Sequence, residues 1–468
     1  MKKRILYNIP SMISLIIIII SITAIIFFGV FSTKYIALII AAEVLLYLLS
    51  IILYNLKNKI LKIIGIFLMI IQILGNCIAY YYVNNTDQYL TKNFEVESYK
   101  VKTSYYLVGP ISNNYTSLDD IKSEDKVYYY KFSQSVNKAL EKIKNNTPIE
   151  TMELYGGLVS IYQEGSMLLV AKADYDYIME ATNSLSRDSY KIICEFEVVE
   201  YFKINNNLPE AYNVYINGVD FSGNSRDFNM IATINTKTHK IVLTSIPRDY
   251  YMYVPALGMN DSLKGLGLVD SQVAKEALEN LFDIKIDYTL NLYTESLVKV
   301  VDTIGGVEYC SDKTFRTTHD LALGTYEDKG EKLLVRKGCH TYNGLETLAI
   351  ARERVNISTI GDRGRTAVDR QIIVNILKKI ATVDTIKNYK AVLNSLDGTY
   401  TSNINKRTII DLIKKSIDNP QYEVIEQSVD GKDTLAPCRQ GSGMLWALEP
   451  YMDTVNNASN KIKEIINE

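Results

Sequence analysis

The stretch FNMIATINTKTHKIVLTSIPRD, residues 228–249, decides the fold. Two apolar runs flank the polar residues NTKTHK, a pattern typical of two strands joined in a hairpin. The second run contains only small hydroxyl residues besides its apolar ones, which predicts a buried strand. Pro247 ends this strand and fixes the point at which Arg248 and Asp249 leave the sheet.

Strand and helix patterns alternate on both sides of this hairpin, as in α/β domains. Asn343 followed by Glu346 has the spacing of a capping box, so a helix is expected to begin there. The expected elements are strands over 211–220 and 287–293 and helices over 271–282, 295–304 and 344–351. We assign residues 209–468 to this α/β domain, with its motif core at 211–381.

Three long apolar runs open the chain. No Asp, Glu, Lys or Arg lies between Arg4 and Lys34, and the following two runs are interrupted only by Glu43 and by a short lysine-containing loop. Each run is long enough to cross a hydrocarbon core of about 30 Å. We therefore expect a membrane anchor with three transmembrane helices over residues 1–85. Glu43 is expected to accept a hydrogen bond from a neighbouring helix, with a functional role as the alternative.

The distribution of basic residues predicts the orientation of this anchor. Basic residues cluster before the first run and between the second and third, whereas Lys34 alone occupies the other loop. The positive-inside rule then predicts a multi-pass protein of the cell membrane with a cytoplasmic N-terminus and extracellular C-terminal domains. A cleaved signal peptide is the competing interpretation, but the first run is long and two further runs follow it.

Charge and cysteine content exclude some functions. The net charge of −2 gives no excess of positive charge, so nucleic-acid binding is not expected. Four of the five cysteines lie beyond the apolar runs, where disulfides persist. We expect Cys310 to pair with Cys339, because they bracket one polar insertion, although four cysteines allow three pairings. A zinc site is not favoured, since no paired cysteine spacing occurs.

Residues 86–208 are expected to form a linker and an accessory α/β domain. The segment NNTDQYLTKN, residues 84–93, has the composition of a polar linker, and the strand-helix alternation after it predicts a mainly parallel sheet. The hydrophobic pattern of 116–132 resembles one lobe of an extracellular solute-binding protein. No second lobe follows, so a structural or protein-contacting module is the favoured interpretation. Strands are expected over 104–109, 126–132 and 166–173, and helices over 135–145, 156–165 and 174–185.

Arginines gather where the expected elements of the α/β domain end or begin. Arg352 and Arg354 are two residues apart and share one face only if the chain leaves the helix there. Asp362 and several arginines follow at a helix start, where backbone amides favour anions. Guanidinium groups match phosphate oxygens, so a polyanion such as pyrophosphate is expected. The six arginines concerned are Arg248, Arg352, Arg354, Arg363, Arg365 and Arg370.

Carboxylates flank the same region. Asp220 and Asp227 lie on either side of the loop expected after the first strand of the domain. Carboxylates near a phosphate site commonly hold Mg²⁺, which completes its shell with water and phosphate oxygens. Metal and arginine together would stabilise the charge that develops during phosphoryl transfer.

In order and spacing, four motifs resemble the LytR-CpsA-Psr (LCP) family of cell-wall assembly proteins. They are GVDF…RDFNMIATINTKTHKIVLTSIPRDYY, IDYTLNLY…LVKVVDTIGGVEY, KGCHTYNGLETLAIARERV and GDRGR…RQ. The resemblance implies an α/β/α sandwich and a membrane-anchored phosphotransferase. Such enzymes move an anionic glycopolymer, of teichoic acid or capsule type, from a polyprenyl pyrophosphate carrier to peptidoglycan.

The resemblance also implies roles for individual residues. Asp220 and Asp227 would hold Mg²⁺ or Mn²⁺, and Asp249 would either activate the acceptor hydroxyl or, as we favour, orient Arg248. The expected catalytic residues are Arg248, Asp249, Arg352 and Arg354. The expected pyrophosphate ligands are Arg226, Arg248, Arg352, Arg354, Arg363, Arg365, Arg370 and Gln371.

The chain departs from the family pattern at three places. It has Ser225-Arg226-Asp227 where Arg-Ser-Asp is usual, and Ser262 stands where a lysine is usual. After Asp362, Val368 and Asp369 stand where Arg and Gln are often found, which leaves Arg370 and Gln371 two positions further on. Two other functions therefore stay open. One is hydrolysis of a polyprenyl pyrophosphate, with water as the acceptor, and the other is a non-catalytic envelope binding or regulatory protein.

Overall fold

The structure is a computed structural model that divides into two compact units. The anchor unit comprises Met1–Val96, Asn206–Leu208 and Ile404–Tyr422, and the α/β unit comprises Glu97–Asn205, Pro209–Asn403 and Glu423–Glu468. The structure describes residues 2–94, 98–129, 134–146, 149–153, 166–172, 175, 189–203, 209–219, 226–268, 271–322, 330–353, 355–356, 362–380, 389–419, 421–438 and 444–468.

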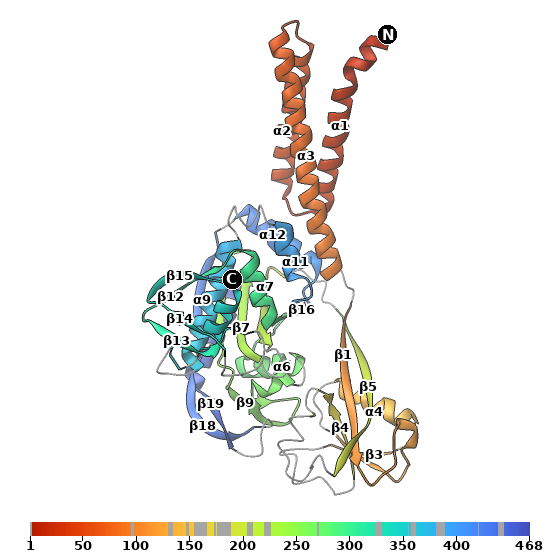
Figure 1. The fold of residues 1–468 in the computed structure, drawn as a ribbon, viewed down its shortest axis with the longest axis vertical. Coiled ribbons are helices and arrows are strands. Elements are labelled where there is room, and N and C mark those ends of the chain that lie inside the picture. Colours follow the sequence, from red (N-terminus) through yellow and green to blue (C-terminus); the bar gives the residue numbers. More distant parts are fainter. Residues whose placement is uncertain are drawn as a thin grey trace. The chain divides into compact units, whose positions relative to one another are not determined.

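The anchor unit contains the three expected apolar helices, drawn from red to orange in Figure 1. They are α1 (Lys2–Phe28), α2 (Thr33–Asn55) and α3 (Lys59–Phe94), and each is long and apolar enough to cross a membrane. The polar linker expected at 84–93 is wrong, because α3 continues to Phe94. Neither glycine nor proline interrupts this segment, and Asn85, Thr86 and Asn93 each donate a side-chain hydrogen bond to the carbonyl four residues earlier.

Glu43 of α2 is bound by side chains of α3, as expected. Gln72 Nε2 donates to Glu43 Oε2 at 2.6 Å and Asn76 Nδ2 donates to Oε1 at 3.1 Å. Gln72 and Asn76 are buried. Because an unsatisfied polar group is costly in a bilayer, these contacts hold α2 and α3 together.

A short helix from late in the sequence also belongs to the anchor unit. Helix α12 (Lys406–Asp418) contacts α3 through an ion pair of 2.9 Å between Lys406 and Asp87. At its other end, the Ser32 hydroxyl donates to Asp418 at 2.7 Å. The segment 404–422 therefore joins two strands of the α/β unit by way of the anchor unit.

The accessory part forms a five-stranded mixed sheet. The order is β3-β2-β4-β1-β5, with β2 parallel to β3 and β4, and β1 antiparallel to β4 and β5. The expectation of a mainly parallel sheet is wrong, because the unpredicted strand β5 forms a long antiparallel ribbon with β1. Apart from Tyr175, the helices expected over 156–165 and 174–185 lie outside the described residues. The elements are β1 (Ser98–Pro110), η1 (Leu118–Asp120), β2 (Lys126–Tyr129), α4 (Gln134–Asn146), β3 (Glu150–Glu153), β4 (Met167–Ala171) and β5 (Tyr190–Lys203).

The predicted hairpin is at the centre of a six-stranded sheet with the order β16-β11-β6-β7-β8-β17. β6, β7 and β8 are successive antiparallel neighbours, β11 is parallel to β6, and β17 is parallel to β8. His239 in the turn between β7 and β8 has a φ of 55°. The strands are β6 (Ala211–Val219), β7 (Arg226–Asn235), β8 (Lys240–Ser245), β11 (Tyr288–Tyr293), β16 (Tyr400–Ser402) and β17 (Glu423–Ser428).

Helices cover both faces of this sheet, which confirms the α/β/α sandwich. Tyr215 and Ile231, cross-strand neighbours, pack in one core with residues of α6 and α13. α7 contacts β11, and α9 contacts β8 through Arg370, which donates to Ser245 on the opposite face. The helices are α6 (Ser271–Phe282), α7 (Thr294–Thr303), α8 (Gly344–Arg352), α9 (Asp362–Ile380), α11 (Tyr389–Leu396) and α13 (Met452–Asn467).

Small sheets and one disulfide complete the α/β unit. Cys310 and Cys339 form the expected disulfide between two paired strands. The capping box of α8 is also confirmed, since Asn343 Oδ1 accepts from the amide of Glu346. The remaining elements are β9 (Tyr251–Val254), β10 (Met259–Ser262), η2 (Gly265–Leu268), β12 (Val307–Ser311), β13 (Phe315–Asp320), β14 (Lys332–Val335), β15 (Gly338–Tyr342), β18 (Gly431–Pro437) and β19 (Met444–Pro450).

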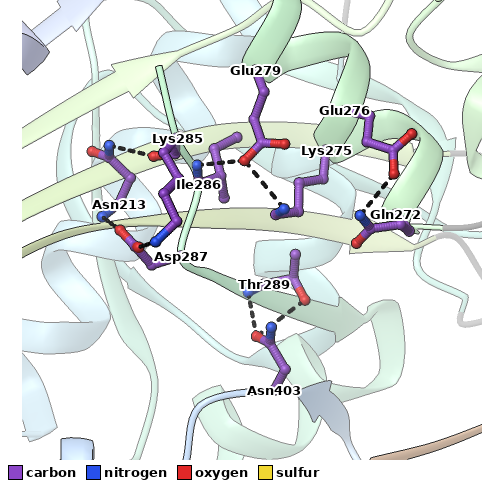
Figure 2. Close-up of polar contacts among 10 residues, drawn as sticks. All are labelled: Asn213, Gln272, Lys275, Glu276, Glu279, Lys285, Ile286, Asp287, Thr289 and Asn403. Atoms are coloured by element: carbon purple, nitrogen blue, oxygen red, sulfur yellow. Dashed lines mark hydrogen bonds and ion pairs between the residues drawn. The ribbon is translucent and has the colours of Figure 1, made fainter. Parts of the chain in front are cut away.

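A network of polar contacts fixes the end of the sheet at which β6 and β11 begin (Figure 2). Asn213 Nδ2 donates to the carbonyl of Lys285 at 2.8 Å, and the backbone amide of Asn213 donates to Asp287 at 3.1 Å. On α6, Glu279 accepts from the amide of Ile286 at 2.7 Å. These contacts join α6 and the start of β11 to β6.

Candidate functional site

The candidate site lies at the opposite end of the same sheet. Because β11 runs parallel to β6 and β17 runs parallel to β8, all four strands end at one edge, and β7 begins there. The carboxyl edge of an α/β sheet is where ligands commonly bind. Several of the polar residues predicted from the sequence follow or begin these strands, so the topology brings them to one edge.

A row of amide side chains crosses the sheet just behind this edge. Asn217 of β6 is in register with Asn291 of β11 and with Asn229 of β7, and Asn291 is in register with Thr401 of β16. Asn217 and Asn229 are buried. We did not predict this row from the sequence, although asparagine is depleted in strands and its presence inside three of them was an available signal.

Hydrogen bonds link the row across the strands. Asn217 Nδ2 donates to Asn291 Oδ1 at 2.7 Å, and Asn291 Nδ2 donates to Thr401 Oγ1 at 2.9 Å. The Tyr215 hydroxyl donates to Asn229 Oδ1 at 2.6 Å. Burial raises the pKa of Tyr215 to about 12, so the tyrosine stays a neutral donor.

Arg226, the first residue of β7, lies against this row. Its Nη1 donates to Asn217 Oδ1 and, at 3.3 Å, to Asn291 Oδ1. The side chain is only 5% exposed, and its Nε atom has no hydrogen-bond partner among the described residues. The predicted pyrophosphate ligand is therefore a buried guanidinium group held by neutral amides.

Arg248 lies between two carboxylates at the end of β8. It forms an ion pair with Asp227, and its Nε donates to Asp249 Oδ2 at 3.3 Å. Arg248 and Asp249 are buried, whereas the side chain of Asp227 is 33% exposed. The predicted residues Asp227, Arg248 and Asp249 thus lie together, and Asp249 is placed to orient the guanidinium group.

Arg370 of α9 approaches the edge from the other face of the sheet. It contacts Glu426 of β17, and its Nη1 donates to Ser245 Oγ at 3.2 Å. Gln371, the next residue on α9, is half-buried. The positive charge of Arg370 is therefore neutralised by a carboxylate, as is that of Arg248, whereas Arg226 has no described carboxylate partner.

Arg352, the first arginine of the R-x-R pair, is the last residue of α8. The helix ends at Arg352 and the backbone of Glu353 is extended, as the spacing predicted. Arg352 Nη1 donates to the carbonyl of Ala322 at 3.1 Å. Burial raises the pKa of Glu353, but hydrogen bonds led by the amides of Asn356 and Thr318 outweigh it, so the pKa lies below its ordinary value.

Four of the predicted site residues are not described in full by the structure. Asp220 and Arg354 lie outside the described residues, and Asp220 directly follows Val219, the last residue of β6. The backbone at Arg363 and Arg365 belongs to the first turn of α9, which begins at Asp362 as predicted, but their side chains are not described.

The chemistry of this edge suits a hard cation as well as an anion. Asp227 offers carboxylate oxygens, which Mg²⁺ and Mn²⁺ prefer, and it is partly exposed. One of its oxygens is engaged by Arg248. The donor type therefore fits the expected metal, with Asp227 as the described contributor.

Together these observations define the class: an α/β/α protein with an arginine- and carboxylate-lined sheet edge, joined to three helices apolar and long enough to span a membrane. A family model matches residues 176–461, more than half of the chain, so the chain belongs to the LytR_cpsA_psr family.

Curated relatives share this part of the chain. The chain is 28% identical over 212 residues to Biofilm regulatory protein A of Streptococcus mutans, which covers 42% of this chain and 50% of that protein. It is 30% identical over 206 residues to the polyisoprenyl-teichoic acid–peptidoglycan teichoic acid transferase TagU of Bacillus subtilis, covering 43% of this chain and 63% of that protein. The chain thus spans from half to somewhat under two thirds of these relatives.

Solved structures are also similar. Protein gbs0355 from Streptococcus agalactiae matches with a TM-score of 0.46 and 24% identity, over 55% of this chain and 88% of that one. TagU of B. subtilis matches with a TM-score of 0.42 and 24% identity, over 55% of this chain and 98% of that one.

Proposed function

We propose that this protein is a membrane-anchored phosphotransferase of cell-wall assembly. It moves an anionic glycopolymer, of teichoic acid or capsule type, from a polyprenyl pyrophosphate carrier to a hydroxyl group of peptidoglycan. The observation that carries the proposal is the gathering of Arg226, Arg248, Asp227 and Asp249 at the carboxyl edge of the sheet in a chain of the LytR_cpsA_psr family. The name of the curated relative TagU supports the same reaction.

The reaction needs a phosphate clamp and an acceptor hydroxyl. The acceptor oxygen bonds to the phosphorus next to the glycopolymer, the bridging P–O bond of the pyrophosphate breaks, and the carrier leaves as a polyprenyl phosphate that takes up the hydroxyl proton. Guanidinium groups stabilise charge on the phosphate oxygens. We assign this work to Arg226 and Arg248, with Arg352, Arg354, Arg363, Arg365, Arg370 and Gln371 as further proposed ligands.

Asp249 and Asp227 have different proposed tasks. Asp249 is buried and accepts from Arg248 Nε at 3.3 Å, which supports an orienting role for this carboxylate. Asp227 is partly exposed, which supports a role as a ligand of Mg²⁺ or Mn²⁺ together with Asp220. The metal, when bound, would neutralise pyrophosphate charge.

The location follows from the anchor. We propose that α1, α2 and α3 hold the α/β unit outside the cytoplasm, next to a lipid-linked donor and the peptidoglycan acceptor, since basic residues cluster at the N-terminus and between α2 and α3. A reporter fused after Glu468 should be active on the outer side. Activity of the reporter in the cytoplasm would contradict this orientation.

The reaction is tested with the full chain in detergent, a polyprenyl pyrophosphate-linked glycan, a peptidoglycan fragment and Mg²⁺. We expect phosphate to become covalently joined to the acceptor sugar, and Arg352→Ala to lower turnover at least about a hundredfold with an unchanged circular dichroism spectrum. Release of glycan phosphate into water would identify a hydrolase instead. Substrate binding without either product would identify a non-catalytic binding protein.

A further inference from the structure

Arg226 differs from the other described arginines at the sheet edge in its partners. Arg248 contacts Asp227 and Asp249, and Arg370 contacts Glu426. Arg226 is 5% exposed and donates only to Asn217 and Asn291 among the described residues. It is therefore the buried positive charge that no described carboxylate compensates.

The chemistry of arginine sets the direction of the whole row. A guanidinium group can only donate hydrogen bonds, so the amide oxygen of Asn217 must face Arg226. The amide nitrogen of Asn217 then faces Asn291 Oδ1, at 2.7 Å. The nitrogen of Asn291 in turn faces Thr401 Oγ1, at 2.9 Å. The amide dipoles of Asn217 and Asn291 therefore both point their negative ends toward the guanidinium group of Arg226.

Such a row solvates a charge without cancelling it. Burying a guanidinium group is costly unless polar partners replace its lost water. A carboxylate partner would do so but would also neutralise the charge, whereas amide oxygens leave the net positive charge in place. Because dipoles that are already aligned need no reorganisation, the site is prepared for an anion before the anion arrives.

Arg226 also retains capacity for a ligand. Its Nε is buried and has no partner among the described residues. An unpaired buried donor costs free energy, and an anion that accepts a hydrogen bond from it would recover that cost.

Resting on the proposed function, we propose that Asn217 and Asn291, with Thr401 behind them, are positioning residues that keep Arg226 charged, oriented and uncompensated as the arginine that receives the pyrophosphate of the donor. Arg248, in contrast, is compensated by carboxylates before substrate binds. Among the proposed pyrophosphate ligands, Arg226 thus has no described carboxylate partner, whereas Arg248 and Arg370 already form ion pairs.

The discriminating substitution is Asn217→Asp, which places a carboxylate beside Arg226. The new side chain still accepts from Arg226, and its second oxygen can accept from Asn291 if that amide turns over. The Thr401 hydroxyl can then donate to Asn291 Oδ1, since a hydroxyl is both donor and acceptor. The row therefore stays bonded while the charge of Arg226 is cancelled.

The test uses the full chain in detergent and inorganic pyrophosphate as the probe, with binding measured by calorimetry. We expect Asn217→Asp to weaken binding at least about tenfold, because a charge–charge attraction is lost at short range. The midpoint of thermal unfolding should be unchanged or higher. A merely structural row predicts the reverse, a lower midpoint and unchanged binding.

Asn405→Asp is the matched control. Asn405 Oδ1 caps α12 by accepting from the amide of Thr408 at 2.8 Å, and aspartate is an equally good cap. The control adds the same charge outside the row and should leave binding within twofold. Wild-type binding by Asn217→Asp would overturn the inference. A wild-type chain that binds pyrophosphate but transfers no glycan would contradict the proposed function. It would not contradict the inference about Asn217 and Asn291.

Arg226→Met provides a second measurement if Asn217→Asp does not fold. Methionine removes the charge and fills a similar volume, and replacing a buried charge by an apolar group is often neutral for stability. We expect pyrophosphate binding to fall at least about tenfold. Retained binding in a folded Arg226→Met variant would show that the anion is bound elsewhere, against the inference.

Discussion

The two ends of β6 and β11 carry similar residues with opposite consequences. At the end where these strands begin, Asn213 binds the Lys285 carbonyl, and two ion pairs join Lys285 with Asp287 and Lys275 with Glu279 (Figure 2). At the end where they finish, Asn217 binds Arg226, which has no described carboxylate partner. Both asparagines lie on one face of β6 and both are buried.

The difference separates a structural end of the sheet from the end at which we propose that the ligand binds. Ion pairs and amide hydrogen bonds hold α6 against the start of β11 at the structural end. At the end where β6 and β11 finish, the buried charge of Arg226 has no described carboxylate partner. Such a charge costs stability and persists in proteins where function needs it. The sheet itself is the same, so partner chemistry alone distinguishes the two ends.

The largest effect is expected for Arg248→Ala. This change removes the guanidinium group between Asp227 and Asp249 and leaves their charges uncompensated near the buried edge. Removing one partner of a buried ion pair costs about 3–5 kcal/mol of stability. Because Asp227 is partly exposed to water, we expect a loss near the lower end of that range. Urea unfolding of the purified chain measures the loss. Arg316→Ala, at an exposed arginine, is the control and should cost under about 0.5 kcal/mol.

Next in size is the same substitution made at both ends of β6. Asn213→Asp loses the donor to the Lys285 carbonyl and puts a carboxylate near Asp287, so we expect a loss of roughly 2–3 kcal/mol. Asn217→Asp gains an ion pair with Arg226 and should not lose stability. Thermal unfolding of the two variants side by side checks this. Equal losses at both ends would erase the distinction between them.

Glu353 provides an intermediate case, a buried charge held mainly by backbone amides. Because its pKa is lowered in the folded state, its contribution is present above the ordinary value of 4.5 and is lost as the pH falls through the folded pKa. We expect Glu353→Gln to cost about 1–2 kcal/mol at pH 7 and to flatten the acid limb of the stability profile. An acid limb identical to that of the wild type would contradict this role.

The smallest effect is expected at the balanced end. Lys285 pairs with Asp287 at 2.7 Å, but the lysine side chain is 73% exposed. Solvent screens such a pair, so Lys285→Ala should change stability by no more than about 0.5 kcal/mol and should leave pyrophosphate binding as it was. A clear loss of binding would show that the two ends are coupled.

The sequence predicted the secondary structure of the α/β unit well because its hydrophobic periodicity is local. The hairpin of β7 and β8, the helices α6, α7 and α8 and the end of α8 at Arg352 all follow from residues a few positions apart. The disulfide between Cys310 and Cys339 was found by a similar local argument. In the accessory sheet the same reasoning failed, because strand direction depends on the distant partner of β1.

By itself the sequence determined the three apolar helices, the strand that ends at Pro247 and the residue types of an anion site, since composition and periodicity belong to the chain. Only the tertiary structure decided which buried arginine has no described carboxylate partner. Asn217 and Asn291 are 74 residues apart and meet only because β11 runs parallel to β6 in one register. The contact of Arg226 with Asn291 depends on that register, which no local pattern encodes.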